Sequence, residues 1–394
     1  MAQTVIEGVT LVPGGGRPII PSAAVVLDAD GRVTEISEAA GANGAGDLYL
    51  VPAGVDLHLD NLVQRRRPRA TVSLDHEAVI SVLDAECAAA GIGTVCVAAR
   101  CEDSPRKGIE IADAAVLAAV VEELAPHLAC DWRIHARVEL TDDRSLDALT
   151  AVLSASSRVA LISLIETSAQ RSRFATLAET RAFYAQDWGV SEAEVEAVFT
   201  VDAGRLSQIA ERRKEVAALA VSRNIALASH DDRTPEHIDE AFEVGARVAE
   251  FPLTIEAARH AADLGMNVVL GAPNAIRGRS TSTGNVLASD AVAAGVCDVL
   301  CSDYLPSALL AAPLALASGG AAPLSTAIDL VSVNPAGVLG LPHAVIEVGQ
   351  PLTASLRRIG SDTARSQVGM ALWRAGQQVF GRQSLGSTFA AAAV

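Results

Sequence analysis

The sequence is poor in aromatic residues and has no long apolar run. Phe, Trp and Tyr make up 3% of its 394 residues although half of the residues are hydrophobic, so small aliphatic side chains must supply the core. The longest apolar stretch, Ala308 to Ala317, contains Pro313 and is too short to cross a bilayer. The six cysteines form no C-x-x-C pair, which argues against a zinc cluster and favours buried thiols in a reducing compartment.

Positive charge is also scarce. The chain has 31 Lys and Arg residues against 47 Asp and Glu, a formal net charge of -16, which disfavours binding to nucleic acid or to anionic membranes. The basic run from Arg65 to Arg69 is the exception, and we interpret it as a solvated loop in preference to a polyphosphate site. Residues Met1 to Thr10 lack the pattern of a signal peptide, so we expect a cytoplasmic protein.

The middle of the chain alternates between apolar, strand-like runs and amphipathic helical patterns. This alternation predicts an α/β fold of parallel strands with right-handed crossovers. The predicted strands are Leu48 to Leu57, Thr94 to Ala98, Trp132 to Leu140, Val159 to Ile165, Ile225 to Ala228, Arg247 to Phe251, Asn267 to Leu270 and Cys297 to Cys301. About eight such units indicate a closed (β/α)8 TIM-like barrel. A doubly wound sheet is the alternative, but no G-x-G-x-x-G follows the first strand.

Both ends of the chain have a sequence pattern typical of short strands joined by turns. Thr4 to Val12 and Ala23 to Leu27 are apolar near one end, and Val345 to Val348, Ser355 to Ile359 and Val368 to Trp373 near the other. We therefore predict that residues 1–50 and 345–394 form one small β-sandwich domain, beside a barrel of residues 51–344. The segment from Thr176 to Arg223 is longer than one crossover needs, and we expect extra helices there.

Metal-competent side chains recur where the predicted barrel strands end, which is where barrels carry their active sites. His58 and Asp60 are two residues apart and so face the same side of an extended chain. The full set of candidate metal ligands is His58, Asp60, Glu166, His230, Glu250 and Asp303. A site rich in carboxylates suits Mn²⁺ or Mg²⁺, while imidazole keeps Zn²⁺ possible. We predict one or two divalent ions, with Glu166 bridging them if there are two.

Five short runs surround the candidate residues and occur in a fixed order along the chain. They are Asp56-Leu-His-Leu-Asp-Asn61, Ser229-His-Asp-Asp232, Ala249-Glu-Phe-Pro252, Gly271-Ala-Pro-Asn274 and Ser302-Asp-Tyr304. These runs resemble the amidohydrolase superfamily, and within it the PhnM family of phosphonate-utilisation hydrolases. The resemblance implies a metal-dependent hydrolase in which Asp303 is the general base. It also implies that metal-activated water cleaves a phosphoanhydride of a ribose 1-phosphonate 5-triphosphate and releases pyrophosphate, and that a homodimer is possible.

The loop from Arg277 to Asn285 is rich in hydrogen-bond donors and leads into a predicted helix. Arg277, Arg279, Ser280 and Asn285 suit phosphate oxygens, although a polar loop that caps the helix explains them equally well. On the third strand, His135, Arg137 and Glu139 alternate onto one face. We interpret His135 as a substrate-contacting or supporting residue, with an internal ion-pair network as the alternative.

Two other functions remain open at the level of sequence. The first is a divergent amidohydrolase that cleaves the C–N bond of a cyclic amide or N-acyl compound with the same metal and base. The second is a catalytically dead binding subunit, which the presence of His58, Asp60, His230 and Asp303 argues against. The loop after strand four, Glu166 to Gln170, and the Arg277 loop differ from the PhnM pattern, so the substrate is the least determined part of the prediction.

Overall fold

The fold is described from a computed structural model. The structure describes residues 3–38, 46–69, 71–104, 108–174, 176–280, 284–342, 344–360 and 367–382. None of the described helices is both long and apolar enough to span a membrane. All six cysteines are buried and unpaired, as the sequence predicted.

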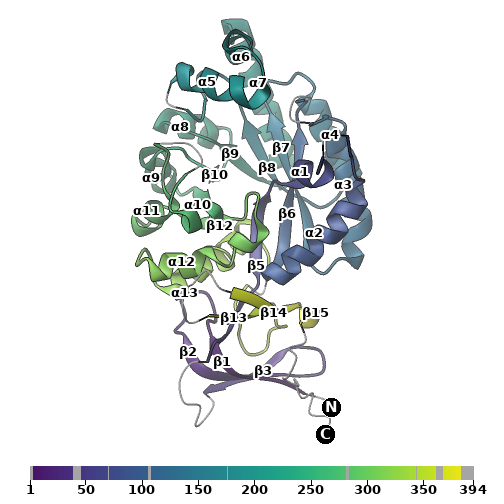
Figure 1. The fold of residues 1–394 in the computed structure, drawn as a ribbon, viewed down its shortest axis with the longest axis vertical. Helices are drawn as coiled ribbons and strands as arrows, with labels where there is room; N and C mark the ends of the chain where they lie inside the picture. The colour runs from purple at the N-terminus through teal and green to yellow at the C-terminus, as the bar shows by residue number, and fades with distance from the viewer. Residues whose placement is uncertain are drawn as a thin grey trace.

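The larger part of the molecule is a barrel of eight parallel strands in chain order (Figure 1). These strands are β5 (Gly54–Leu59), β6 (Ile92–Cys101), β7 (Asp131–Glu139), β8 (Val159–Ile165), β9 (Ala226–His230), β10 (Val248–Glu250), β11 (Asn267–Gly271) and β12 (Val299–Cys301). The (β/α)8 prediction is confirmed, and the predicted strands lie within a few residues of the observed ones. β12 returns to β5, because the Asp303 N–H donates to the His58 carbonyl at 2.9 Å and Leu59 bridges to Asp303.

Helices surround the barrel and connect its strands. They are α1 (Leu62–Arg66), α2 (His76–Ala90), α3 (Asp113–Leu124), α4 (Ser145–Ala155), α5 (Leu177–Trp188), α6 (Glu192–Phe199), α7 (Ala203–Ser222), α8 (Pro235–Glu243), α9 (Ile255–Asp263), α10 (Ala272–Arg277), α11 (Ala288–Ala293), α12 (Ala312–Ser318), α13 (Leu324–Asp329) and α14 (Val333–Val338). The extra helices expected between Thr176 and Arg223 are α5 and α6, which precede the crossover helix α7. Figure 1 shows them at the end of the molecule farthest from the terminal strands.

The two ends of the chain build one separate seven-stranded sheet, in the order β15-β14-β13-β4-β1-β2-β3. Its strands are β1 (Thr4–Leu11), β2 (Ile20–Leu27), β3 (Val33–Glu38), β4 (Leu48–Pro52), β13 (Ala354–Ile359), β14 (Gln367–Arg374) and β15 (Gln377–Gly381). Two details differ from the prediction. The run Leu48 to Leu57 is interrupted at Ala53 into β4 of this sheet and β5 of the barrel, and residues 345–348 form no strand.

The barrel interior is apolar below the site and polar at the carboxyl ends of the strands. A buried cluster of small aliphatic residues, including Val55, Leu161, Val248, Val269 and Val299, fills the lower part of the barrel. Side chains alternate between the interior and the exterior along each strand, so these apolar residues point into the barrel. They pack beneath the polar residues at the strand ends and limit the movement of those residues. This arrangement places the candidate residues at one end of the barrel.

Candidate active site

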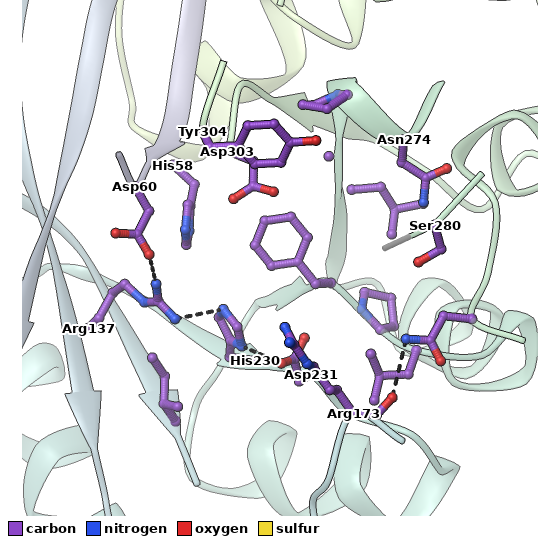
Figure 2. A pocket seen from close by; sticks show the side chains of 18 of the residues that line it. His58, Asp60, Arg137, Arg173, His230, Asp231, Asn274, Ser280, Asp303 and Tyr304 are labelled. Atoms are coloured by element: carbon purple, nitrogen blue, oxygen red, sulfur yellow. Dashed lines mark hydrogen bonds and ion pairs between the residues drawn. The ribbon is translucent and has the colours of Figure 1, made fainter. Parts of the chain in front are cut away.

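A cavity of about 370 Å³ opens at the carboxyl ends of the barrel strands. Figure 2 shows His58, Asp60, His230 and Asp303 around it. His58 and Asp60 come from the end of β5, His230 from the end of β9, and Asp303 from just after β12. Four of the six predicted ligands therefore line one pocket. A fifth, Glu250, lies at the end of β10, fully buried against His58.

His58 and Glu250 form a buried pair. His58 Nδ1 lies 2.8 Å from Glu250 Oε1, and ligand atoms of His58, His230 and Glu250 all lie within 4.8 Å of one another. Burial alone would raise the pKa of Glu250, but His135 and His58 lower it to about 2. Burial likewise opposes charge on His58, yet the carboxylate raises its pKa. Glu250 is therefore an anion in this pocket.

This donor set fits a divalent cation. Two imidazoles and one carboxylate converge, and Glu250 Oε2 is buried without a hydrogen-bond partner. A buried carboxylate oxygen with no donor is costly unless something positive binds it. The geometry thus supports metal binding at His58, His230 and Glu250.

Asp303 is held in an unusual backbone conformation beside this cluster. Its φ of 56° lies in the left-handed region, which costs energy for a residue other than glycine, although Asp and Asn tolerate it best. The preceding residue is fixed by Asp56, whose buried carboxylate accepts from the Ser302 N–H at 2.9 Å and the Ser302 hydroxyl at 2.5 Å. Burial raises the pKa of Asp303, which makes its carboxylate a stronger base.

Asp60 is engaged by two arginines. Arg137 donates to Asp60 directly, and Arg100 Nη1 lies 3.5 Å from the same carboxylate. Burial opposes ionisation of Asp60, but Arg100 and Arg137 outweigh it and hold the pKa well below its usual range. Arg137 Nη2 also lies 3.4 Å from His230 Nε2. Asp60 thus anchors two cations at the edge of the pocket.

His135 is fully buried beneath the site and does not line the cavity. Its Nδ1 lies 3.1 Å from the Leu57 carbonyl, and its Nε2 lies 2.9 Å from the Ser163 hydroxyl. Since a carbonyl only accepts, Nδ1 carries the proton and Nε2 accepts from Ser163. Burial lowers the pKa of His135 to about 3. The residue supports the site and does not reach a substrate in this cavity.

We expect His135 to make the protein acid-labile. Above pH 6.5, the ordinary histidine pKa, the ring is neutral in both the folded and the unfolded chain. As the pH falls from 6.5 towards 3, the approximate pKa of His135 in the folded protein, this histidine becomes protonated in the unfolded chain but stays neutral in the folded one. Stability is therefore lost, by up to about 1.4 kcal/mol per pH unit. When the free energy of unfolding is measured with urea between pH 7 and pH 4, its decrease with falling pH should be smaller for His135→Gln than for the wild type.

The matched control is His260→Gln, because His260 is a partly exposed histidine paired with Asp239. Both variants are measured in chelator, so that release of a metal ion does not contribute. Parallel stability profiles for the wild type and His135→Gln would contradict the expectation.

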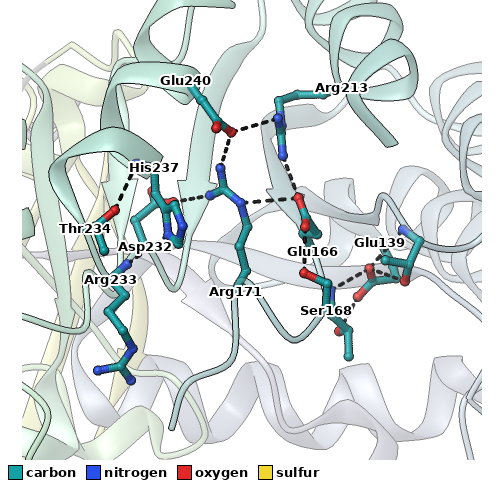
Figure 3. Close-up of polar contacts among 12 residues, drawn as sticks. Glu139, Glu166, Ser168, Arg171, Arg213, Asp232, Arg233, Thr234, His237 and Glu240 are labelled. Atoms are coloured by element: carbon teal, nitrogen blue, oxygen red, sulfur yellow. Dashed lines mark hydrogen bonds and ion pairs between the residues drawn. The ribbon is translucent and has the colours of Figure 1, made fainter. Parts of the chain in front are cut away.

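Glu166 does not lie at the metal-competent cluster, contrary to the sequence expectation. Its neighbour Ile165 lines the cavity, and because successive side chains alternate along a strand, Glu166 faces away from it. Figure 3 shows it paired with Arg213 at 2.6 Å and Arg171 at 3.2 Å, and accepting from Ser168. These contacts belong to an ion-pair network that also includes Asp232 and Glu240.

The donor-rich loop lies at the cavity. Arg277, Arg279, Ser280 and Asn285 all line it, and Arg277 Nη1 lies 3.4 Å from the Tyr304 hydroxyl. Residues 281–283 of the predicted loop lie outside the described residues. The basic run after β5 is engaged elsewhere, since Arg65, Arg66 and Arg67 pair with acidic residues of the neighbouring segments.

Several cavity residues escaped prediction. Arg100 sits inside an apolar strand, where a lone charge was the signal that could have identified it. Arg173, Asp231, Phe251 and Tyr304 also line the cavity, but they lie in loops beyond the strands. Asp231 and Tyr304 directly follow predicted ligands, whereas nothing in the local pattern around Arg173 marks it as a cavity residue.

The parallel eight-stranded barrel, with histidines and carboxylates at its carboxyl ends, has the architecture of a metal-dependent hydrolase of the amidohydrolase superfamily, and the sequence comparison supports this class. Over 339 residues, 84% of this chain and 88% of the relative, the sequence is 33% identical to the alpha-D-ribose 1-methylphosphonate 5-triphosphate diphosphatase of Escherichia coli (strain K12). The chain belongs to the family of this diphosphatase, the PhnM family. It matches no protein-family model.

Solved structures agree with this fold. N-acetyl-D-glucosamine-6-phosphate deacetylase from Mycobacterium smegmatis superposes with a TM-score of 0.58 at 16% identity, over 96% of this chain and 100% of that one. 5-Methylcytosine deaminase from Klebsiella pneumoniae superposes with a TM-score of 0.61 at 13% identity, over 98% of this chain and 99% of that one. At such identities the similarity concerns the fold alone.

Proposed function

We propose that this protein hydrolyses a phosphoanhydride bond of a phosphorylated sugar, of the ribose 1-phosphonate 5-triphosphate type, and releases pyrophosphate. The observation that carries the proposal is one cavity with two kinds of wall. His58 and His230 of the metal-competent cluster line one part of it together with Asp303, and Arg277 and Arg279 line another. Neither arginine forms an ion pair with a described residue, although the chain has an excess of carboxylates. Unpaired arginines in an acidic protein suit an anionic substrate.

In this proposal His58, His230 and Glu250 hold a divalent ion. Such an ion supplies Lewis acidity, which makes water a better acid and nucleophile near neutral pH. Asp303 accepts the proton of the attacking water at its carboxylate and returns it to the leaving pyrophosphate oxygen. Asp60 keeps Arg137 at the edge of the cluster, where its guanidinium faces negative charge on the substrate. Arg277 and Arg279 bind phosphoryl oxygens and orient the chain.

The test is a pyrophosphate-release assay with sugar and nucleoside triphosphates, run on the wild type and on Arg277→Ala. Loss of one charge-assisted contact should lower kcat/KM for a triphosphate by about 10- to 100-fold, while a neutral amide substrate would be turned over equally by both. Pyrophosphate release that depends on Arg277 supports the proposal. Turnover of neutral amides without pyrophosphate release would reject it in favour of C–N hydrolysis.

A further inference from the structure

The segment between β8 and β9 carries a small aromatic core of its own. The chain has only 13 aromatic residues (7 Phe, 3 Tyr and 3 Trp), and five of them lie between residues 174 and 199. They are Phe174, Phe183, Tyr184, Trp188 and Phe199, and each ring centroid lies 4.8 to 5.2 Å from that of at least one other ring in the group. The two helices that contribute most of them, α5 and α6, each begin with a capping box. We call residues 174 and 176–199 the cap.

Arg173 lies on this aromatic core and lines the active-site cavity. Its guanidinium carbon is 4.7 Å from the centre of the Phe183 ring and 5.4 Å from that of Phe174. Its backbone carbonyl accepts from Arg233 at 2.8 Å and from the Asn285 amide at 3.4 Å. The residue is thus positioned through both its side chain and its backbone.

Among the described residues Arg173 forms no ion pair, although the Asp231 carboxylate is near enough for the Arg173 charge to help lower the pKa of Asp231. The ring faces attract the cation but supply no hydrogen-bond acceptor in its plane, and Arg173 Nε is buried without a hydrogen-bond partner. Arg171 and Arg213, by contrast, are each paired with both Glu166 and Glu240. Of these three arginines, the one that lines the cavity is therefore the one that forms no ion pair with a described carboxylate.

Arg173 and the partner of Arg277 lie on different sides of the cavity. Arg277 Nη1 lies 3.4 Å from the Tyr304 hydroxyl, and Figure 2 shows Tyr304 and Asp303 across the pocket from Arg173, which lies beside Asp231 and His230. Cationic contacts on different walls of one cavity suit a chain of several phosphoryl groups.

We infer that Arg173 is a specificity-determining residue: it binds a phosphoryl group that Arg277 and Arg279 do not reach, and it thereby makes the site select triphosphates over shorter chains. The inference rests on the proposed function and adds to it a residue that packs against the cap. The planar guanidinium fork binds two phosphoryl oxygens at once, and the aromatic stack holds it in that orientation before the substrate arrives.

The experiment measures binding by titration calorimetry, with the divalent ion in excess over the ligand. The probes are inorganic tripolyphosphate, pyrophosphate and phosphate, and the variants are Arg173→Met and Arg173→Lys. Methionine keeps an unbranched side chain against the rings, so the cap retains its packing. We expect Arg173→Met to weaken the binding of tripolyphosphate by about 10- to 100-fold and the binding of phosphate far less. The affinity of Arg173→Lys for tripolyphosphate should lie between those of the wild type and Arg173→Met. The matched control is Arg181→Met on α5, whose side chain pairs with Glu196 and does not line the cavity.

The possible results separate the inference from the proposed function. Loss of chain-length preference in Arg173→Met but not in Arg181→Met supports the inference. Unchanged tripolyphosphate binding in Arg173→Met, or an equal loss for all three probes, overturns it and leaves the proposed function intact. A wild type that binds none of the three probes overturns both.

Discussion

Replacement of His58 by alanine should remove the metal ion and lower turnover by at least about 10³-fold, since a bound metal ion contributes several kcal/mol to such reactions. His58 is buried, contacts Glu250 at 2.8 Å and belongs to the cluster with His230. Its loss deletes one donor and leaves a buried carboxylate with one partner fewer. Elemental analysis of purified protein, together with the pyrophosphate assay, measures both effects.

The same substitution also destabilises the fold, and this needs a control. Breaking a buried pair costs about 3–5 kcal/mol, so His58→Ala could lose activity by unfolding. His58→Gln retains an amide that can donate to Glu250, and should fold while still lacking the imidazole. His260→Ala, on a partly exposed histidine, should keep metal and turnover. Full metal content in a folded His58→Gln would refute the proposed ligand set.

Asp303→Asn should lower kcat by about 10²- to 10⁴-fold, the usual contribution of a general base. Asparagine is nearly isosteric and tolerates the positive φ of 56° at this position, so the backbone and the neighbouring ligands should be retained. Burial raises the pKa of Asp303, and the base must be ionised to act. Wild-type activity should therefore fall as the pH is lowered through that pKa, and this acid limb should be missing in Asp303→Asn.

Asp231→Asn provides the comparison for Asp303. Asp231 also lines the cavity and also has a positive φ, of 57°, but its carboxylate lies 3.4 Å from His230 Nδ1 and so orients a ring. Its replacement should reduce kcat much less and preserve the acid limb. Equal losses in the two variants would remove the special role of Asp303.

The barrel could be predicted because its signal is periodic and local. Each strand is a short apolar run between helical patterns, and polar residues at strand ends converge in any closed parallel barrel. His58, His230 and Asp303 follow from that rule alone. The terminal sheet was also predictable in outline, but β3 and β15 were missed, since short, largely exposed strands carry little apolar pattern.

The rest of the site depends on contacts between distant segments. Glu166 stands one residue past a strand end, where a shift of one position changes the face, and only the positions of Arg171 and Arg213 reveal that it points outward. The pairing of Asp60 with Arg100 and Arg137 joins three strands. Arg173 lies in an insertion whose path over the cavity follows no period, so no sequence pattern could place it.

The terminal sheet has a consequence for the order of events during synthesis. β4 pairs with β13, about 300 residues later in the chain, and only Ala53 separates β4 from β5, which carries His58. Contacts of such large sequence separation form late, because a long loop must close first. While the ribosome is still producing the barrel, β4 lacks its partner β13. The sheet that precedes β5 is therefore incomplete, and it does not yet fix the position of the strand that carries His58. We therefore expect that activity appears only after β13 has left the ribosome, however early the barrel strands collapse.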